Sequence, residues 1–423
     1  MSFKADKQTL EDLNLTGKFK PNSIYQLFSR IKTTGGERLL EQMFQQPLTD
    51  PDAINHRSAT FRYFQEQRLT FPFSSSDVQA AENYLTMSGA AGLPSILRKR
   101  LNAFLHDEEY EQLRKGLMAT LHLLRTFKSF LQQLNNYEEA ALWRQVLSDL
   151  TWLSNVKELS VWTIAYYDRQ LRHRLSAQME QLLQGIYQLD VYIAVSDVAR
   201  QRGFHYATAL PASRNIFHTT GLRHPALDAG IANAISLDSR SNVIFLTGAN
   251  MAGKSTLMKS FGIALYLGHM GFPVAAANME FSVRDGLYSS INVPDNLNMG
   301  YSHFYAEVLR VKQVATEVSS GKNLVVIFDE LFKGTNVKDA YDATLAVTTA
   351  FARYSNCFFL ISTHIIEVGQ ALQTHANLQF TYLPTLLDGA KPRYTYRLTE
   401  GITSDRHGMT IIENEQILEL LES

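Results

Sequence analysis

The stretch TGANMAGKST, residues 247–256, has the residue types and the spacing of a phosphate-binding loop. Gly248 and Gly253 are separated by four residues, and Lys254 and Ser255 follow, which is the pattern G-x-x-x-x-G-K-[ST]. The glycines let successive amide groups point at a phosphate chain, the next helix adds its positive dipole end, and the hydroxyl can ligate Mg²⁺. We therefore expect a nucleotide to be bound by Gly248, Ala249, Asn250, Met251, Ala252, Gly253, Lys254, Ser255 and Thr256.

Two further polar groups follow apolar runs and could complete this site. Asp329 and Glu330 end the run VVIFDE, and His364 comes shortly after CFFLIS. Carboxyl ends of parallel strands share one sheet edge, so these side chains should emerge beside the loop. We expect Asp329, with Ser255, to hold Mg²⁺, Glu330 to activate a water, and His364 to sense a γ phosphate, with Lys254 assisting catalysis. Taken alone, an acid pair or a lone histidine at a strand end is more often structural.

The elements that must position these groups differ along the chain. After about Pro211, the short apolar runs NVIFL, NLVVIF and CFFLIS alternate with helical stretches, which predicts a parallel sheet in an α/β domain. Before about Leu210 the pattern is helical. One segment has a single buried face, which favours packing in a helical domain over a coiled-coil arm or a partner-binding helix. Its leucines recur in steps of three, four or seven at Leu113, Leu117, Leu121, Leu124, Leu131 and Leu134.

Composition narrows the class of protein. The chain has 423 residues, 45% of them apolar, and a formal net charge of −1, so no global charge points to nucleic acid or membrane. One cysteine, Cys357, excludes an intramolecular disulfide, and no run of 18 apolar residues occurs, so we expect a cytoplasmic protein with no membrane partner. Two basic clusters favour solvated helix faces over phosphate contacts. They are Arg98, Lys99, Arg100 and Arg169, Arg172, Arg174.

These motifs resemble those of the MutS family, the ATPases of DNA mismatch repair, within the wider ABC-type class. The family's loop TGPNMGGKST is similar to TGANMAGKST, and its LDEIGRGTS is similar to FDELFKGTN at residues 328–336. Its ATHYFEL resembles STHIIEV at residues 362–368, and its DDLxxGxSTFMxE resembles DNLNMGYSHFYAE at residues 295–307. Residues 27–57 resemble the opening of the family's helical core, and GLRHPAL at residues 221–227 resembles the start of its ATPase domain.

The resemblance implies an all-α core and lever domain over residues 1–212, followed by an ABC-type P-loop NTPase domain over residues 213–423. It implies ATP and Mg²⁺ as cofactors. Ser302, in the signature segment, would cap the γ phosphate of a partner subunit, so the resemblance also implies a homodimer with two composite ATP sites.

Departures from the family's pattern refine this expectation. The family's mismatch-reading and connector domains have no counterpart here, and the stretch before Leu189 is too short for full levers with a DNA clamp. The family stacks adenine between a Phe and a His, and Gly230 and Tyr396 hold those positions, so Tyr396 can stack whereas Gly230 cannot. Phe332 and Lys333 replace a Gly-Arg pair in the loop that couples the two sites.

Two functions remain open. The first is an Mg²⁺-dependent, ATP-switched dimer that binds DNA and acts in DNA repair or on branched or distorted DNA, together with additional repair proteins. The alternative is a nucleotide-gated dimeric protein-interaction module that does not act on DNA, and the near-neutral charge motivates it.

Overall fold

The computed structural model describes residues 3–17, 20–87, 108–134, 137–148, 150, 160–249, 251–291, 303–388, 391–403 and 420. The chain divides into two compact units. The first contains Met1–Phe28, Met43–Glu66 and Val195–Ser423, and the second contains Ser29–Gln42 and Gln67–Ala194. Because these units interleave segments of the chain, they do not test the expected boundary between residues 212 and 213, which stays a prediction.

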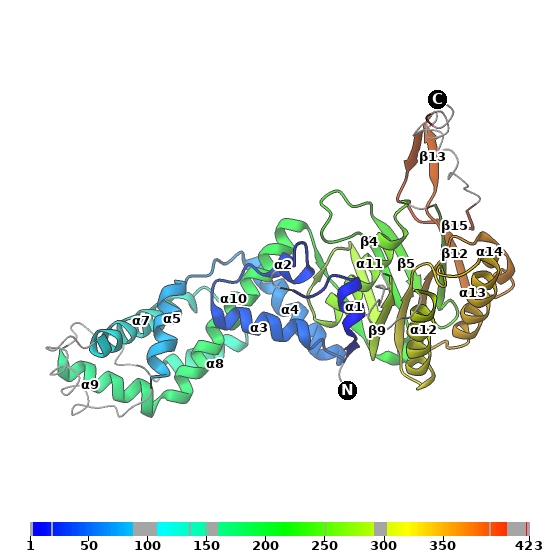
Figure 1. The fold of residues 1–423 in the computed structure, drawn as a ribbon. Helices are drawn as coiled ribbons and strands as arrows, with labels where there is room; N and C mark the ends of the chain where they lie inside the picture. Colours follow the sequence, from blue (N-terminus) through cyan, green and yellow to red (C-terminus); the bar gives the residue numbers. More distant parts are fainter. Residues whose placement is uncertain are drawn as a thin grey trace. The chain divides into compact units, whose positions relative to one another are not determined.

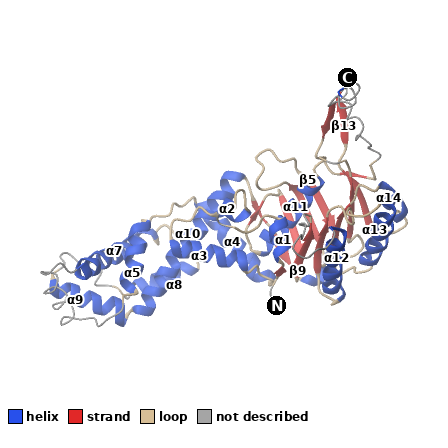
Figure 2. Cartoon of the chain, viewed as in Figure 1, coloured by secondary structure: helices blue, strands red, loops and turns tan. Residues whose placement is uncertain are grey.

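A seven-stranded sheet forms the centre of the first unit (Figure 2). All of its neighbouring strands are parallel except β12 and β15. The three apolar runs form buried strands, as expected, and the strand that precedes His364 lies between the strand of the loop and the strand of the acids. In spatial order the strands are β1 (Lys4–Ala5), β9 (Gly286–Ser290), β10 (Leu324–Phe328), β11 (Phe358–Ser362), β6 (Val243–Thr247), β12 (Leu378–Tyr382) and β15 (Thr399–Glu400).

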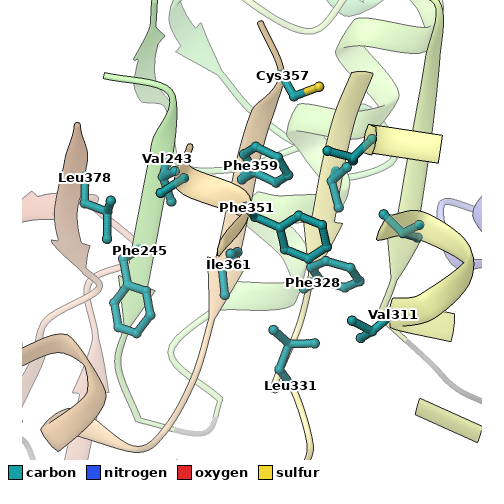
Figure 3. Close-up of a cluster of buried hydrophobic side chains, with 14 of the residues drawn as sticks. Val243, Phe245, Val311, Phe328, Leu331, Phe351, Cys357, Phe359, Ile361 and Leu378 are labelled. Carbon is teal, nitrogen blue, oxygen red and sulfur yellow. The ribbon is translucent and has the colours of Figure 1, made fainter. Parts of the chain in front are cut away.

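Helices cover both faces of this sheet. On one face, side chains such as Phe328, Phe359 and Phe245 form a buried cluster with α12 (His303–Ser319), α13 (Val337–Ala352) and α14 (Ile366–Leu372) (Figure 3). On the other face lies α11 (Lys254–His269), where a Cβ added to Gly262 would come within 2.9 Å of the Ile327 side chain. Burial on both faces explains why the strands are apolar without alternation.

The first unit contains further elements besides this sheet and its helices, and the hairpin that includes β13 (Thr385–Asp388) projects away from the sheet (Figure 1). Within the described ranges no helix is both long and apolar enough to cross a membrane. A second, four-stranded sheet has the order β3 (Thr208–Leu210), β8 (Asn278–Ser282), β4 (Phe217–Leu222) and β5 (Asn233–Leu237). The other elements are the pair β2 (His205–Tyr206) and β7 (Pro273–Val274), the hairpin β13 (Thr385–Asp388) and β14 (Lys391–Tyr394), the helices α1 (Lys7–Asp12), α2 (Ile24–Phe28) and α4 (Pro51–Gln67), and the 3₁₀ turn η3 (Ala212–Arg214).

The amino-terminal segment is built into the large sheet. Strand β1 pairs with β9, and the Asp12 carboxylate at the end of α1 accepts hydrogen bonds from Ser289 Oγ at 2.7 Å and Ile291 N at 2.9 Å. Arg310 of α12, which is buried, pairs with Asp6. Residues 1–212 are helical for the most part, as expected, but they are not all-α: they include β1, β2 and β3, strands of two or three residues that are too short to produce a detectable period.

The second unit is helical. It contains α5 (Ser75–Leu85), α7 (Glu108–Phe130), α8 (Glu139–Ser148), α9 (Val161–Arg169) and the π-helical turn η2 (Gln170–Arg174), with parts of α3 (Thr34–Gln45) and α10 (Ser176–Arg202). The leucine stripe packs inside this unit, as expected, since all six leucines are buried. Helix α5 lies against α7, where a Cβ added to Gly116 would collide with Tyr84.

One basic cluster has a different role from the one expected. Arg172 is buried rather than solvated, and its guanidinium forms two hydrogen bonds with the Asp168 carboxylate, at 2.7 and 2.9 Å. Tyr84 donates a third hydrogen bond to Asp168 at 3.0 Å. A buried charge needs such a partner, and the four-residue spacing of the pair does not show that it is buried. Arg169 and Arg174 are exposed, as expected, and residues 98–100 lie outside the described residues.

Candidate nucleotide site

The glycine-rich loop joins β6 directly to α11. Gly248 and Gly253 have φ values of 146° and 100°, in the region that favours glycine. Gly253 has a second constraint, because a Cβ there would come within 2.9 Å of Tyr396 Cδ1. Lys254 is the first residue of α11, so the amino-terminal end of this helix opens at the loop. The loop therefore has the expected strand, turn and helix context, and Asn250 lies outside the described residues.

Lys254 brings a buried positive charge to this loop. Its Nζ donates to the carbonyl oxygens of Gly248 at 2.8 Å and Ala249 at 3.2 Å, and lies 3.9 Å from Glu330 Oε1. Burial lowers the pKa of Lys254, while the nearby Glu330 and Asp329 carboxylates act in the opposite direction. An ammonium group that is largely removed from water and bonded mainly to neutral carbonyls is well placed to bind an anion.

Asp329 reaches the loop across the intervening strand β11. Ser255 Oγ, on α11, donates to one of its carboxylate oxygens, and Ser362 Oγ, at the end of β11, donates to the other. The main-chain N–H of Asp329 donates to the Ser290 carbonyl at 3.0 Å. The structure thus brings Asp329 and Ser255 together, as the shared sheet edge led us to expect.

Glu330 adopts a strained backbone conformation beside Asp329. Its φ is 53°, and its N–H donates to the Ser362 carbonyl at 3.1 Å and to Ser362 Oγ at 3.2 Å. Ser362 therefore fixes both acids at once. Met251 in the loop and Tyr396 beside it also have positive φ values. Strain of this kind costs roughly 1–3 kcal/mol per residue and concentrates at functional sites.

A pocket of about 690 Å³ extends from the loop. At its phosphate end lie Ala249, Met251, Gly253, Lys254, Ser255, Thr256 and Glu330. The rest of its lining is mixed and includes Leu222, Leu227, Gly230, Ile231, Leu383 and Tyr396 together with the polar Arg223 and His224. One pocket that combines a buried ammonium group with apolar and aromatic side chains has the polarity that a nucleotide requires.

Asn233 of β5 fixes the position of Tyr396 in this pocket. Its Nδ2 donates to the Tyr396 carbonyl at 3.0 Å, and its Oδ1 accepts from Leu398 N at 2.7 Å. Tyr396 has a φ of 55°, so this side-chain clamp supports a backbone conformation that a tyrosine rarely adopts. Gly230 lines the same pocket, and a Cβ there would lie 3.3 Å from Arg223 Cβ.

Several expected site residues lie elsewhere. His364 is exposed and is not among the residues that line the pocket, and Ala252 is a buried residue of the loop that does not line the pocket either. Ser302 lies outside the described residues. The roles expected of these residues stay predictions.

The pocket also contains residues that motif spacing did not identify. Asn233 and Leu383 line it without any motif of their own. His224 also lines it, and burial, aided by the nearby Lys259, lowers the pKa of its imidazole. The signal for His224 was present in GLRHPAL, which the sequence related to the family but not to a position in the pocket.

A parallel sheet whose central strand passes through a glycine-rich loop into a buried helix defines a mixed α/β P-loop domain, and a largely helical unit accompanies it here. Comparison with protein families agrees with both parts. Residues 8–200 match the model of MutS domain III, and residues 244–420 match that of MutS domain V. The chain belongs to the MutS family.

Individual relatives support the same assignment. DNA mismatch repair protein MutS of Leuconostoc citreum is 28% identical over 242 residues, which is 56% of this chain and 28% of the relative. The protein of the same name from Leuconostoc mesenteroides is 28% identical over 251 residues, 57% of this chain and 29% of the relative. That from Wolbachia pipientis wMel is 26% identical over 226 residues, 53% and 26% of the two chains. The matched region thus spans less than a third of these relatives.

Proposed function

We propose that this chain is a MutS-like, Mg²⁺-dependent ATPase of the ABC type, which binds DNA as an ATP-switched dimer and acts in DNA repair or on branched or distorted DNA. The observation that carries the proposal is the convergence of Lys254, Ser255 and Glu330 on one pocket, with Asp329 hydrogen-bonded to Ser255 beside it. Family membership and the names of the relatives, DNA mismatch repair protein MutS, support the DNA part.

The residues at the loop fit a Mg²⁺-nucleotide. Ser255 and Asp329 present a hydroxyl and a carboxylate side by side, and hard oxygen ligands of this kind suit Mg²⁺. Among the described residues, no three His, Cys, Asp or Glu side chains gather as a metal cage, so phosphates and waters would supply the other ligands. When bound, Mg²⁺ would neutralise charge that develops on the phosphates.

The chain's own side chains have distinct roles in this proposal. The Lys254 ammonium binds the β and γ phosphates, and Asp329, held by Ser362, keeps its carboxylate aimed at Ser255. Glu330, whose side chain is about a quarter exposed within the pocket, orients a water and accepts its proton. Tyr396 stacks on the base, and His364 approaches the γ phosphate when ATP binds.

The dimer follows from the family's signature segment, in which Ser302 would reach the partner's γ phosphate. We expect Glu330→Gln to bind ATP, stall hydrolysis and accumulate as a dimer, because removal of the base leaves binding contacts intact. Size-exclusion chromatography with light scattering, with and without ATP, tests this. Lys254→Ala is the control that should bind no ATP and show no ATP-dependent dimer. A Glu330→Gln protein that stays monomeric at saturating ATP would remove the trans role of Ser302.

The central test of the proposed function is steady-state ATP hydrolysis with matched duplex, mismatched duplex or a branched junction, with Glu330→Gln as the blank. We expect one of these DNAs to stimulate hydrolysis, and we expect high salt to remove the stimulation, since phosphate contacts release counterions. The near-neutral charge of the chain favours a second candidate, a nucleotide-gated module that opens and closes on a protein partner. Robust hydrolysis that is indifferent to all three DNAs would favour that candidate.

A further inference from the structure

Helix α9, in the second unit, presents two large aromatic side chains to solvent. Trp162 is 68% exposed and Tyr166 is 50% exposed. They are four residues apart, so they lie one turn apart on the same side of the helix, about 6 Å apart along its axis. Arg169, also exposed, continues this side by a further turn. We call the side formed by Trp162, Tyr166 and Arg169 the α9 outer face.

Packing of the helical unit does not account for this exposure. The opposite side of α9 is already buried through Ile164, Ala165, Tyr167 and Asp168. The Ser160 side chain caps the helix by accepting a hydrogen bond from Thr163 N at 3.3 Å. Helix α9 is therefore packed and capped without Trp162 and Tyr166, and each of these rings exposes a large apolar area to water.

The α9 outer face is cationic. The only acid in α9 and η2, every residue of which the structure describes, is Asp168, and the buried pair with Arg172 neutralises it. Arg169 and Arg174 are exposed without an acid of these two elements beside them in solvent.

We propose that the α9 outer face binds unpaired bases of single-stranded DNA, which stack on Trp162 and Tyr166 while Arg169 pairs with a phosphate. Exposed aromatic rings beside cations form the usual platform for single strands, because every base has a flat face that can stack. A duplex hides those faces inside its own stack, so this surface discriminates in favour of unpaired DNA. The inference rests on the proposed DNA binding and specifies which feature of a branched or distorted DNA the second unit recognises.

Fluorescence anisotropy with a labelled oligo(dT) strand and with a duplex of equal length tests the proposal on the full chain. We expect Trp162→Ala/Tyr166→Ala to weaken oligo(dT) binding at least about tenfold and to leave duplex binding unchanged, because stacking is lost only for unpaired bases. Trp162→Phe/Tyr166→Phe keeps both rings and should bind oligo(dT) nearly as wild type does. Leu142→Ala, at a side chain of α8 that is 55% exposed, is the matched surface control.

Salt dependence tests the cation separately. Arg169→Ala should lower the slope of log affinity for oligo(dT) against log salt by about 0.7, the value for one phosphate contact on a single strand. An unchanged slope would contradict the phosphate contact. Equal thermal midpoints for all variants would show that the surface changes leave folding intact, so that their binding affinities can be compared.

Three other results would overturn the inference. Wild-type oligo(dT) affinity in the double alanine variant would remove the stacking site while leaving the proposed ATPase and its duplex binding in place. Loss of self-association in that variant, with DNA binding intact, would make the outer face a contact between copies of the chain. A wild-type chain that hydrolyses ATP but binds no DNA of any form would refute the DNA part of the proposed function together with this inference.

Discussion

Ser362 holds the two acids of the nucleotide site in place, although it belongs to neither motif that suggested them. It donates to Asp329 and accepts from the Glu330 amide, and it is fully buried. We expect Ser362→Ala to weaken the apparent affinity for Mg²⁺ by about 10- to 100-fold, as is common when a group behind a metal ligand is removed. A Mg²⁺ titration of ATP hydrolysis measures this.

Ser282→Ala provides the control for this experiment, since Ser282 is equally buried and accepts a hydrogen bond from Ile216 N at 3.0 Å in another part of the unit. This variant should lose stability but keep the Mg²⁺ dependence of wild type. If both serine variants shift the titration equally, Ser362 has no special role in holding Asp329.

Asn233 and Tyr396 form a second pair that acts at the residue scale. Asn233→Ala removes both hydrogen bonds that support the strained tyrosine, so we expect the dissociation constant for ATP to rise by about five- to tenfold. Tyr396→Ala should give a similar loss, and Tyr396→Phe should give almost none because it retains the ring. Calorimetric titrations with ATP measure all three.

The double variant decides whether Asn233 acts through Tyr396. If it does, Asn233→Ala/Tyr396→Ala should bind ATP no more weakly than Tyr396→Ala, because residues that act as a unit are not additive. Additive losses would show that Asn233 contributes to binding by some other route.

The motifs identified the residues whose types and spacing the chemistry of the site constrains. They did not identify the residues that hold those groups in place. The loop glycines, Lys254 and the acid pair were predictable because phosphate and metal chemistry constrains both their type and their separation. Asn233 and Ser362 are ordinary polar residues far along the chain from the groups they hold, and only the fold brings them close. The expected exposure of Arg172 was wrong for another reason: its partner Asp168 is only four residues away, but the burial of the pair depends on how the helix packs.

At the scale of elements, α11 links the phosphate loop to a buried histidine at its opposite end. His269 donates from Nδ1 to the Leu48 carbonyl at 2.7 Å, and its Nε2 accepts from Arg284 N at 3.2 Å, so both nitrogens are satisfied by the neutral ring. Complete burial lowers the pKa of His269 from 6.5 to about 3. The hydrogen bonds at the carboxyl-terminal end of α11 therefore depend on a neutral His269, which acid would protonate.

The sign of this effect follows from proton binding. Below about pH 6.5 the unfolded chain binds a proton on this histidine, and the folded chain does not until about pH 3. The free energy of unfolding should thus fall as pH is lowered between these values, by up to about 1.4 kcal/mol per pH unit from this group. Urea unfolding at pH 7, 6 and 5 measures the slope. We expect a shallower slope in His269→Gln, and no change in His218→Gln, where the histidine is exposed. Equal slopes in all three proteins would contradict the assignment.

Element type was easier to predict than element order. The runs at β6, β10 and β11 were recognisable because strands covered on both faces are continuously apolar. Their spatial order was not, since nothing in the apolar run that forms β11 indicates that it inserts between the other two. The insertion of β11 between the other two strands brings Ser362 to the acids. Because this strand order could not be predicted, the role of Ser362 could not be predicted either.

At the scale of the whole molecule, the first compact unit is assembled from three separated segments of the chain. A fragment of residues 213–423, the expected ATPase domain, would lack β1, and the buried Arg310 would lose its partner Asp6. Removing one member of a buried ion pair is costly, commonly about 3–5 kcal/mol. We expect this fragment to aggregate or to lack a cooperative thermal transition, whereas the full chain unfolds cooperatively. A fragment that melts as sharply as the full chain would support the simple boundary.

Family membership was predictable from local motifs, because MutS-like residues recur at both ends of the chain and the family models match both regions. The participation of the amino-terminal segment in the large sheet was not. Two-residue strands carry no periodic signal, and their partners lie far along the chain.

The pairing of Lys4 with Gly286 also sets an order of events during protein synthesis. The ribosome makes the edge strand first and its neighbour only after about two thirds of the chain, so the earliest residues must wait while the helical unit emerges and folds. Long-range pairing of this kind is slow and leaves a sheet edge open to wrong partners. The nascent chain thus remains most vulnerable until its last third is complete, and destabilising changes in that last third would trap the amino-terminal segment without its partner.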